Sequence, residues 1–139
     1  MEKRIYVIVA ATIQVPVVPG SHKPPLRTVF QPHGRQIAQA CHVVSLLRHA
    51  QKPMNFHLDA VLSASNKFEP ITTIILQARD SAEMGHTFSL LHRKRLNPVV
   101  FSDENPEYGP GPWPTAIAVF AAPDQIRGAI DYLPLWGAQ

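Results

Sequence analysis

The chain has 139 residues, of which 45% are hydrophobic and 17% charged, with a formal net charge of +3, a composition that predicts one globular domain over residues 1–139. Its single cysteine excludes an intrachain disulfide, and no window approaches the roughly 18 apolar residues of a membrane span, so we expect a cytoplasmic protein. The small positive charge permits an anionic partner without requiring one. Fourteen prolines, about twice the usual usage, predict long stretches that are neither helix nor central strand.

The N-terminal part is predicted to contain one strand and one long connection. Ile5 to Val9 is a continuous apolar run rich in β-branched residues, typical of a strand that helices cover on both faces. From Gln14 to His33 the sequence has no periodicity and contains five prolines, so we expect neither helix nor strand there. Connections of about 20 residues are uncommon in compact domains and are often functional.

A helix is predicted from Gly34 to Gln51. Its apolar residues recur at spacings of three and four and should face the sheet: Ile37, Ala40, Cys41, Val44 and Leu47. In this orientation Cys41 is a small core residue. Polar side chains gather on the opposite side, within about 80° of one another: Arg35, Gln39, His42 and His49. Because the helix follows the long connection, this polar stripe is expected either to line a cleft or to face solvent.

Beyond this helix, a short helix is expected at Leu58 to Ala64, and Ile71 to Gln77 is predicted to be the second strand. Asp80 and Glu83 have the spacing of an N-terminal capping box, which predicts that another helix begins there. Three apolar residues of that helix should point inward: Met84, Phe88 and Leu91.

A basic run, Arg93-Lys94-Arg95, falls in the predicted last turn of this second long helix. Cations at that position complement the helix dipole. The run is compatible both with a contact to phosphate groups and with an ordinary solvated helix end.

Two more strands and an apolar tail complete the prediction. Val99 to Ser102 and Thr115 to Ala121 are expected to be strands, and the intervening Asp103 to Pro114 contains four prolines, which predict an irregular loop. Pro123 and Asp124 are predicted to open a short helix. The tail from Leu133 to Trp136 is apolar enough to dock on the domain.

Strands that alternate with helices predict an α/β domain with a small mixed four-stranded sheet. The seven histidines are scattered, and His42 and His49 are nearly two helical turns apart, so no metal site is predicted. The sequence contains no nucleophile elbow, glycine-rich phosphate loop or dinucleotide fingerprint, which makes several common enzyme classes unlikely.

One segment resembles a family signature. Residues 34–42, Gly-Arg-Gln-Ile-Ala-Gln-Ala-Cys-His, are similar to the helix-opening motif Gly-Lys-x-x-Ala-Gln-x-x-His of the type 2 peptidyl-tRNA hydrolases. The stretch Ala38 to His42 is most similar to a divergent branch, the peptidyl-tRNA hydrolase domain-containing proteins. The resemblance covers roughly Gly34 to Gly137, with a lengthened middle, and the first strand.

The second half extends the resemblance, with some departures. Asp103 and Thr115 fall at the positions of the family's strand-ending aspartate and of a threonine twelve residues later. The family's lysine is replaced by Arg35, and its first threonine by Glu107. The Ala-Gly that follows the family's aspartate is replaced by Glu104-Asn105.

The resemblance implies a three-layer α/β/α fold and a homodimer that hydrolyses the ester between a peptidyl group and the 3′ ribose of tRNA, without metal or cofactor. Asp103 would accept a proton from a water oriented by Thr115, while Arg35 would hold the oxyanion or the terminal phosphate. Gln39 would position the substrate, and His42 would brace the helix or carry protons. Further substrate contacts would come from Gly34, Glu107, Arg93, Lys94 and Arg95.

Two other functions stay open. A catalytically degenerate RNA-binding domain could keep the same fold, and Glu107 favours this alternative because a carboxylate there would repel phosphate. A small-molecule enzyme could use a cleft reshaped by the long first connection. Asp103 itself is also compatible with a purely structural role, since a strand-end aspartate commonly caps the next turn.

Overall fold

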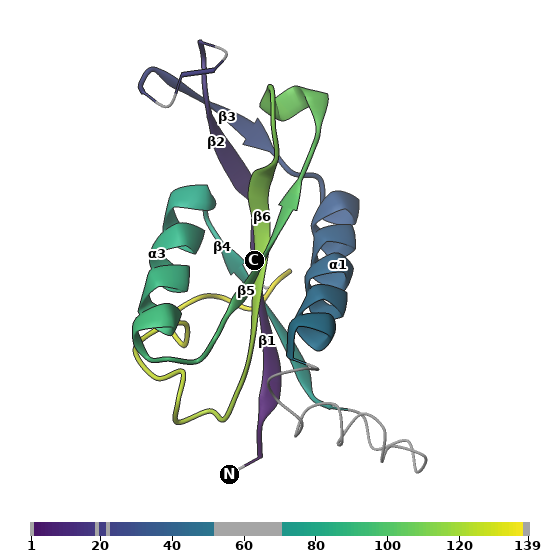
Figure 1. Cartoon of the computed structure of the whole chain (residues 1–139), viewed down its shortest axis with the longest axis vertical. Coiled ribbons are helices and arrows are strands. Elements are labelled where there is room, and N and C mark those ends of the chain that lie inside the picture. Colours follow the sequence, from purple (N-terminus) through teal and green to yellow (C-terminus); the bar gives the residue numbers. More distant parts are fainter. Residues whose placement is uncertain (1, 19, 22, 52–70, 138–139) are drawn as a thin grey trace.

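The computed structural model describes residues 2–18, 20–21, 23–51 and 71–137 (Figure 1). Its centre is a four-stranded sheet in the order β4-β1-β6-β5. β1 (Arg4–Ala10) pairs in parallel with β4 (Thr73–Ala78) and antiparallel with β6 (Trp113–Ala121), which pairs antiparallel with β5 (Val99–Asp103). The predicted α/β domain with a small mixed sheet is therefore confirmed.

Two helices cover the opposite faces of this sheet, α1 (His33–Gln51) and α3 (Ser81–Arg93) (Figure 1). β1 supplies apolar side chains to both faces, which explains its continuous apolar run. Val7 and Val9 pack with the cluster beneath α1, which contains Val43 and Leu47 of the helix. The alternate residues of β1 join the cluster beneath α3: Tyr6, Ile8 and Ala10.

The prediction of an irregular connection after β1 is wrong, because the chain forms a hairpin of β2 (Thr12–Pro16) and β3 (Leu26–Phe30). Of the described prolines, Pro16 ends β2, and Pro24 and Pro25 lie between the strands, positions at which proline is tolerated in a sheet. Ile13, Val15 and Val29 face the α3 side and join its core cluster. The hairpin is therefore held to the domain by a short alternating apolar pattern that the prolines obscured.

The predicted orientation of α1 is confirmed for Ala40, Val44 and Leu47, which pack on the sheet, and is wrong for two other residues. Ile37 is 46% exposed and Cys41 is exposed, although both were expected to face the sheet. Gln36 and Gln39 are buried in their place. The hydrogen bonds that Gln36 and Gln39 donate beneath the helix offset part of the cost of burying their amides.

The capping box of α3 is confirmed. Asp80 accepts a hydrogen bond of 2.8 Å from the backbone N–H of Glu83, and the carboxylate of Glu83 accepts one of 2.8 Å from the N–H of Arg79. Met84 and Leu91 are buried and Phe88 packs against the same core, as predicted.

The C-terminal part differs from the prediction in one respect. Residues 123–132 form turns in place of a helix, with Gly128 in the left-handed region at φ 79°, a conformation that interrupts a helix. The tail docks on the domain as predicted. The backbone N–H of Trp136 donates to Ile75 O, and the backbone N–H of Gln77 donates to Pro134 O, both at 2.9 Å. The tail thus covers the edge of β4, which would otherwise expose unpaired backbone groups.

The loop between β5 and β6 is less irregular than predicted. It contains the short 3₁₀ helix η2 (Pro106–Tyr108), and β6 already begins at Trp113. The helix expected at Leu58 to Ala64 lies outside the described residues. None of the helices in the described part of the chain is long and apolar enough to span a membrane.

Replacing Asp80 by alanine should lower the free energy of unfolding by about 1 kcal/mol, because the first turn of α3 loses its side-chain acceptor. Urea denaturation measures the change, and Asp80→Asn should retain most of the stability. Ser89→Ala, on the exposed side of the same helix, is the matched control and should change stability by less than about 0.5 kcal/mol. Equal losses in Asp80→Ala and Ser89→Ala would contradict the capping role.

Candidate functional site

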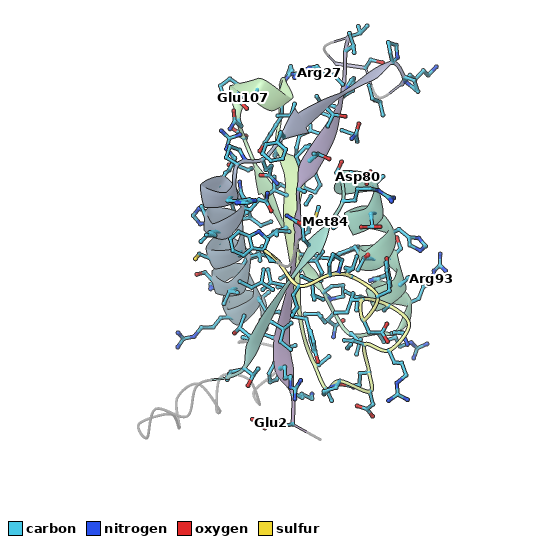
Figure 2. The ribbon with its side chains drawn as sticks, turned by 180° about the vertical axis from the view of Figure 1, so that it is seen from behind. Glu2, Arg27, Asp80, Met84, Arg93 and Glu107 are labelled. Carbon is cyan, nitrogen blue, oxygen red and sulfur yellow. The ribbon has the colours of Figure 1, made fainter. Side chains whose placement is uncertain are left out.

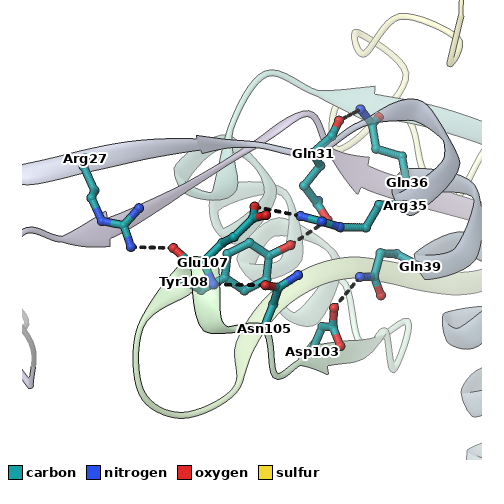
Figure 3. A network of polar contacts seen from close by, with 9 residues as sticks. All are labelled: Arg27, Gln31, Arg35, Gln36, Gln39, Asp103, Asn105, Glu107 and Tyr108. Atoms are coloured by element: carbon teal, nitrogen blue, oxygen red, sulfur yellow. Dashed lines mark hydrogen bonds and ion pairs between the residues drawn. The ribbon is translucent and has the colours of Figure 1, made fainter.

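Four of the predicted site residues meet where α1 begins, beside the loop that follows β5 (Figure 3). We call Arg35, Gln39, Asp103 and Glu107 the α1 cluster. Gln39 Nε2 donates to Asp103 Oδ2 at 2.8 Å, and Arg35 forms an ion pair of 3.2 Å with Glu107. The residues of the first pair are 64 positions apart in the sequence, and those of the second pair are 72 positions apart.

The strand and helix geometry explains the pair of Gln39 and Asp103. Asp103 ends β5 two residues after Phe101, which packs in the cluster beneath α1, so the alternation of the strand turns Asp103 towards α1 as well. Gln39 is only 2% exposed, and its Oε1 atom is buried without a hydrogen-bond partner in the described structure. The amide is therefore oriented by its bond to the carboxylate and keeps an unused acceptor.

The loop after β5 brings Glu107 to Arg35. Asn105 caps η2 by accepting a hydrogen bond of 3.0 Å from the N–H of Glu107, with Pro106 in the first turn. The side chain of Arg35 is 26% exposed and that of Glu107 is 57% exposed, so the pair sits at the surface. The two departures from the family motif at these positions thus contact each other.

Tyr108 forms the buried side of the cluster. It is 1% exposed, and its hydroxyl donates to Gln31 Oε1 at 3.1 Å. Burial raises the pKa of Tyr108 above its ordinary value of 10.0, although its hydrogen bond with Arg35 opposes part of the shift. The hydrogen bond with Glu107 in turn raises the pKa of Arg35, which keeps the guanidinium charged.

Tyr108 is connected to a chain of buried glutamines that the sequence pattern did not predict. Gln31 Nε2 donates to Ala10 O at 2.7 Å, and Gln36 Nε2 donates to Gln31 O at 2.7 Å. Gln36 Oε1 accepts hydrogen bonds from Gln77 at 2.8 Å and from the indole N–H of Trp136 at 3.0 Å. The C-terminal tail is therefore connected through hydrogen bonds to the α1 cluster.

Three further predicted residues lie near the cluster. The hydroxyl of Thr115, which is fully buried, donates to Phe101 O at 3.4 Å beside the irregular register between Phe101 and Ser102. The ring of His42 stacks on that of Phe101, with centroids 4.9 Å apart, so α1 contacts β5 here. Gly34 has nothing within 4 Å of the place where a Cβ would be, so packing does not require glycine there.

The basic run is not part of the α1 cluster. Arg93 ends α3, and Lys94 and Arg95 follow it. Figure 2 shows Arg93 towards the opposite end of the domain from Glu107. A ligand would have to extend along the domain to contact both regions.

No family model matches this chain, and neither does any curated protein. In the described part of the chain, no three histidine, cysteine, aspartate or glutamate side chains form a group that could hold a metal ion. The chemistry that the geometry offers is a carboxylate oriented by an amide, beside a guanidinium and a second carboxylate.

Tyr108→Phe should lower the free energy of unfolding by about 1–2 kcal/mol, because a buried acceptor on Gln31 loses its donor. Urea denaturation at pH 7 measures this loss. Tyr132→Phe is the matched control: Tyr132 is 52% exposed, and its neighbour Thr87 keeps its bond to Glu83 O, so the loss should stay below about 0.5 kcal/mol. A smaller effect in Tyr108→Phe than in the control would contradict the buried network.

The difference in tyrosinate absorbance between the wild type and Tyr108→Phe should have its midpoint above pH 10.0, because burial disfavours the phenolate. Subtracting the absorbance of Tyr108→Phe from that of the wild type removes the contribution of the other tyrosines. The folded state then holds a proton that the unfolded state has released, so this residue makes stability fall as the pH rises above 10.0. A midpoint below pH 10.0 in the folded protein would mean that Arg35 outweighs burial.

Proposed function

We propose that the protein hydrolyses the ester bond between a peptidyl group and the 3′ ribose of tRNA, as the resemblance to the type 2 peptidyl-tRNA hydrolases implies. The observation that carries the proposal is the hydrogen bond of 2.8 Å from Gln39 to Asp103. It joins the helix motif to the strand-ending aspartate, two segments that the resemblance singles out independently. Their direct contact supports a common role in one site.

In this proposal Asp103 is the general base. A water molecule attacks the ester carbonyl carbon while Asp103 accepts a proton from that water, and the bond to the ribose oxygen breaks as Asp103 returns this proton to that oxygen. Gln39 fixes the orientation of the carboxylate through their hydrogen bond. Arg35 carries the positive charge that stabilises the developing oxyanion, once substrate competes with Glu107 for it.

The remaining predicted residues have supporting roles in the same proposal. Thr115 was predicted to orient the attacking water, but it is fully buried and its hydroxyl donates to Phe101 O, so its role in this proposal is to position the end of β5. His42 supports the same strand through its stack on Phe101. Gly34 leaves space at the start of α1 for the substrate. The basic run after α3 contacts phosphates farther along the tRNA. A homodimer and a tRNA partner also belong to this proposal, as the family resemblance implies.

One observation favours a second function, a catalytically degenerate RNA-binding domain. Arg35 is already paired with Glu107, and Asp103 accepts from Gln39, so the α1 cluster holds one cation and two carboxylates. This charge balance does not attract a phosphate or an oxyanion. If Glu107 keeps Arg35 occupied, the domain binds RNA elsewhere and does not turn it over.

The test is incubation of the purified protein with excess N-acetyl-aminoacyl-tRNA, with the released amino acid and the uncharged tRNA measured over time. The wild type should turn over repeatedly. Asp103→Asn should lower kcat by at least about 100-fold, because the general base is lost. Arg35→Ala should lower it by about 100-fold, because the oxyanion loses its cation.

Arg48→Ala is the matched control, since Arg48 is an exposed arginine of the same helix about 20 Å farther along its axis. Its turnover should stay within about twofold of the wild type. Equal turnover in Asp103→Asn, Arg35→Ala and the wild type would refute the assigned site. Retained tRNA binding without any turnover by the wild type would establish the binding domain in place of the hydrolase.

A further inference from the structure

A pocket of about 240 Å³ lies next to the α1 cluster, between the turn that follows β2 and the loop that precedes β6. We call it the hairpin pocket. The residues that matter for its chemistry are Val17, Val18, Arg27, Tyr108, Pro110 and Trp113. They come from the two proline-rich segments of the sequence, which the fold brings together although they are far apart along the chain.

The walls of the pocket are partly apolar and uncovered. Val17 is 50% exposed and Val18 is 56% exposed, and both line the pocket beside Pro110 and the partly buried Trp113. Covering such surface yields about 25 cal/mol for each Å² of apolar area removed from water. A flat apolar or aromatic group can therefore gain free energy by entering, and Trp113 is the aromatic residue beside Tyr108 in the described lining.

Arg27 is the charged residue among the described residues that line the pocket. Its guanidinium donates to the backbone carbonyl oxygen of Glu107, a neutral partner that holds the group in place without cancelling its charge (Figure 3). The carboxylate of Glu107 is engaged instead by Arg35. A guanidinium has five N–H donors, so Arg27 keeps donors for an anion.

We propose that the hairpin pocket binds a nucleoside phosphate, with the base against Trp113 and the valines and the phosphate on Arg27. The volume lies just below the range of about 300–1,000 Å³ usual for small-molecule sites, which favours one nucleotide over a larger ligand. The choice of a nucleotide over another aromatic anion rests on the proposed function. Tyr108 lines the pocket and also contacts Arg35, so a nucleotide bound here adjoins the α1 cluster.

The binding test needs no hydrolysis. AMP, adenosine, inorganic phosphate and N-acetyl-phenylalanine are titrated separately into ¹⁵N-labelled protein, with the indole signal of Trp113 followed by NMR. AMP should bind at least about tenfold more tightly than adenosine or phosphate, because only AMP uses both the apolar wall and Arg27. Tighter binding of N-acetyl-phenylalanine than of AMP, or no shift of Trp113 with AMP, would overturn the proposal.

A short single-stranded RNA separates the two sources of this ligand. If the pocket serves the end of an RNA strand, the oligonucleotide should shift the Trp113 signal at least about as strongly as AMP and compete with it. If AMP binds and the oligonucleotide does not compete, the ligand is a free nucleotide, and the pocket does not serve the proposed tRNA substrate.

Matched variants locate the binding. Arg27→Ala should weaken AMP binding by at least about tenfold, whereas Lys23→Ala, which removes an exposed cation of the same hairpin outside the pocket lining, should stay within about twofold. Val18→Asp should weaken AMP binding by a similar factor. Leu26→Asp changes another exposed residue of the hairpin that does not line the pocket, and it should leave AMP binding unchanged. Equal losses in Arg27→Ala and Lys23→Ala would indicate unspecific attraction and refute the site.

The failures of this inference and of the proposed function are distinguishable. Turnover of tRNA by the wild type without AMP binding refutes the pocket assignment alone. AMP binding that depends on Arg27, without turnover, refutes the hydrolase and leaves the nucleotide site standing.

Discussion

One buried amide holds the candidate site together. The side chain of Gln31 is fully buried and is bonded at both ends, donating to Ala10 O at the end of β1 and accepting from the hydroxyl of Tyr108. Its backbone oxygen accepts from Gln36 in the first turn of α1. A strand, a loop and a helix are thus fixed by a single residue, because each buried polar atom must keep its partner.

Glu107 connects this scaffold to the two positive charges at the surface. Its carboxylate pairs with Arg35 and its carbonyl oxygen accepts from Arg27, so the short helix η2 lies between the α1 cluster and the hairpin pocket. Glu107, one of the departures from the motif that the sequence resembles, is therefore also the residue that links the two regions.

The sequence predicted the elements whose physical signals are local. The apolar run Ile5 to Val9, the capping box at Asp80 and the apolar tail were each recognised, and the structure confirms them. The hairpin was missed because its apolar alternation is short and lies among prolines. The orientation of α1 was wrong in part, because Gln36 and Gln39 are buried against partners in β4 and β5 that lie far away in the sequence.

The amino-acid sequence by itself determined the alternation of strands and helices, since periodicity and capping act over a few positions. The residues of the candidate site were indicated by the resemblance to a family motif. Only the tertiary structure decided which charges pair. Arg35 meets Glu107 and Asp103 meets Gln39 because the sheet order and the short helix η2 bring distant segments to one end of the sheet. The hairpin pocket has the same origin, since Arg27 and Trp113 become neighbours only when β2, β3 and the loop before β6 pack together.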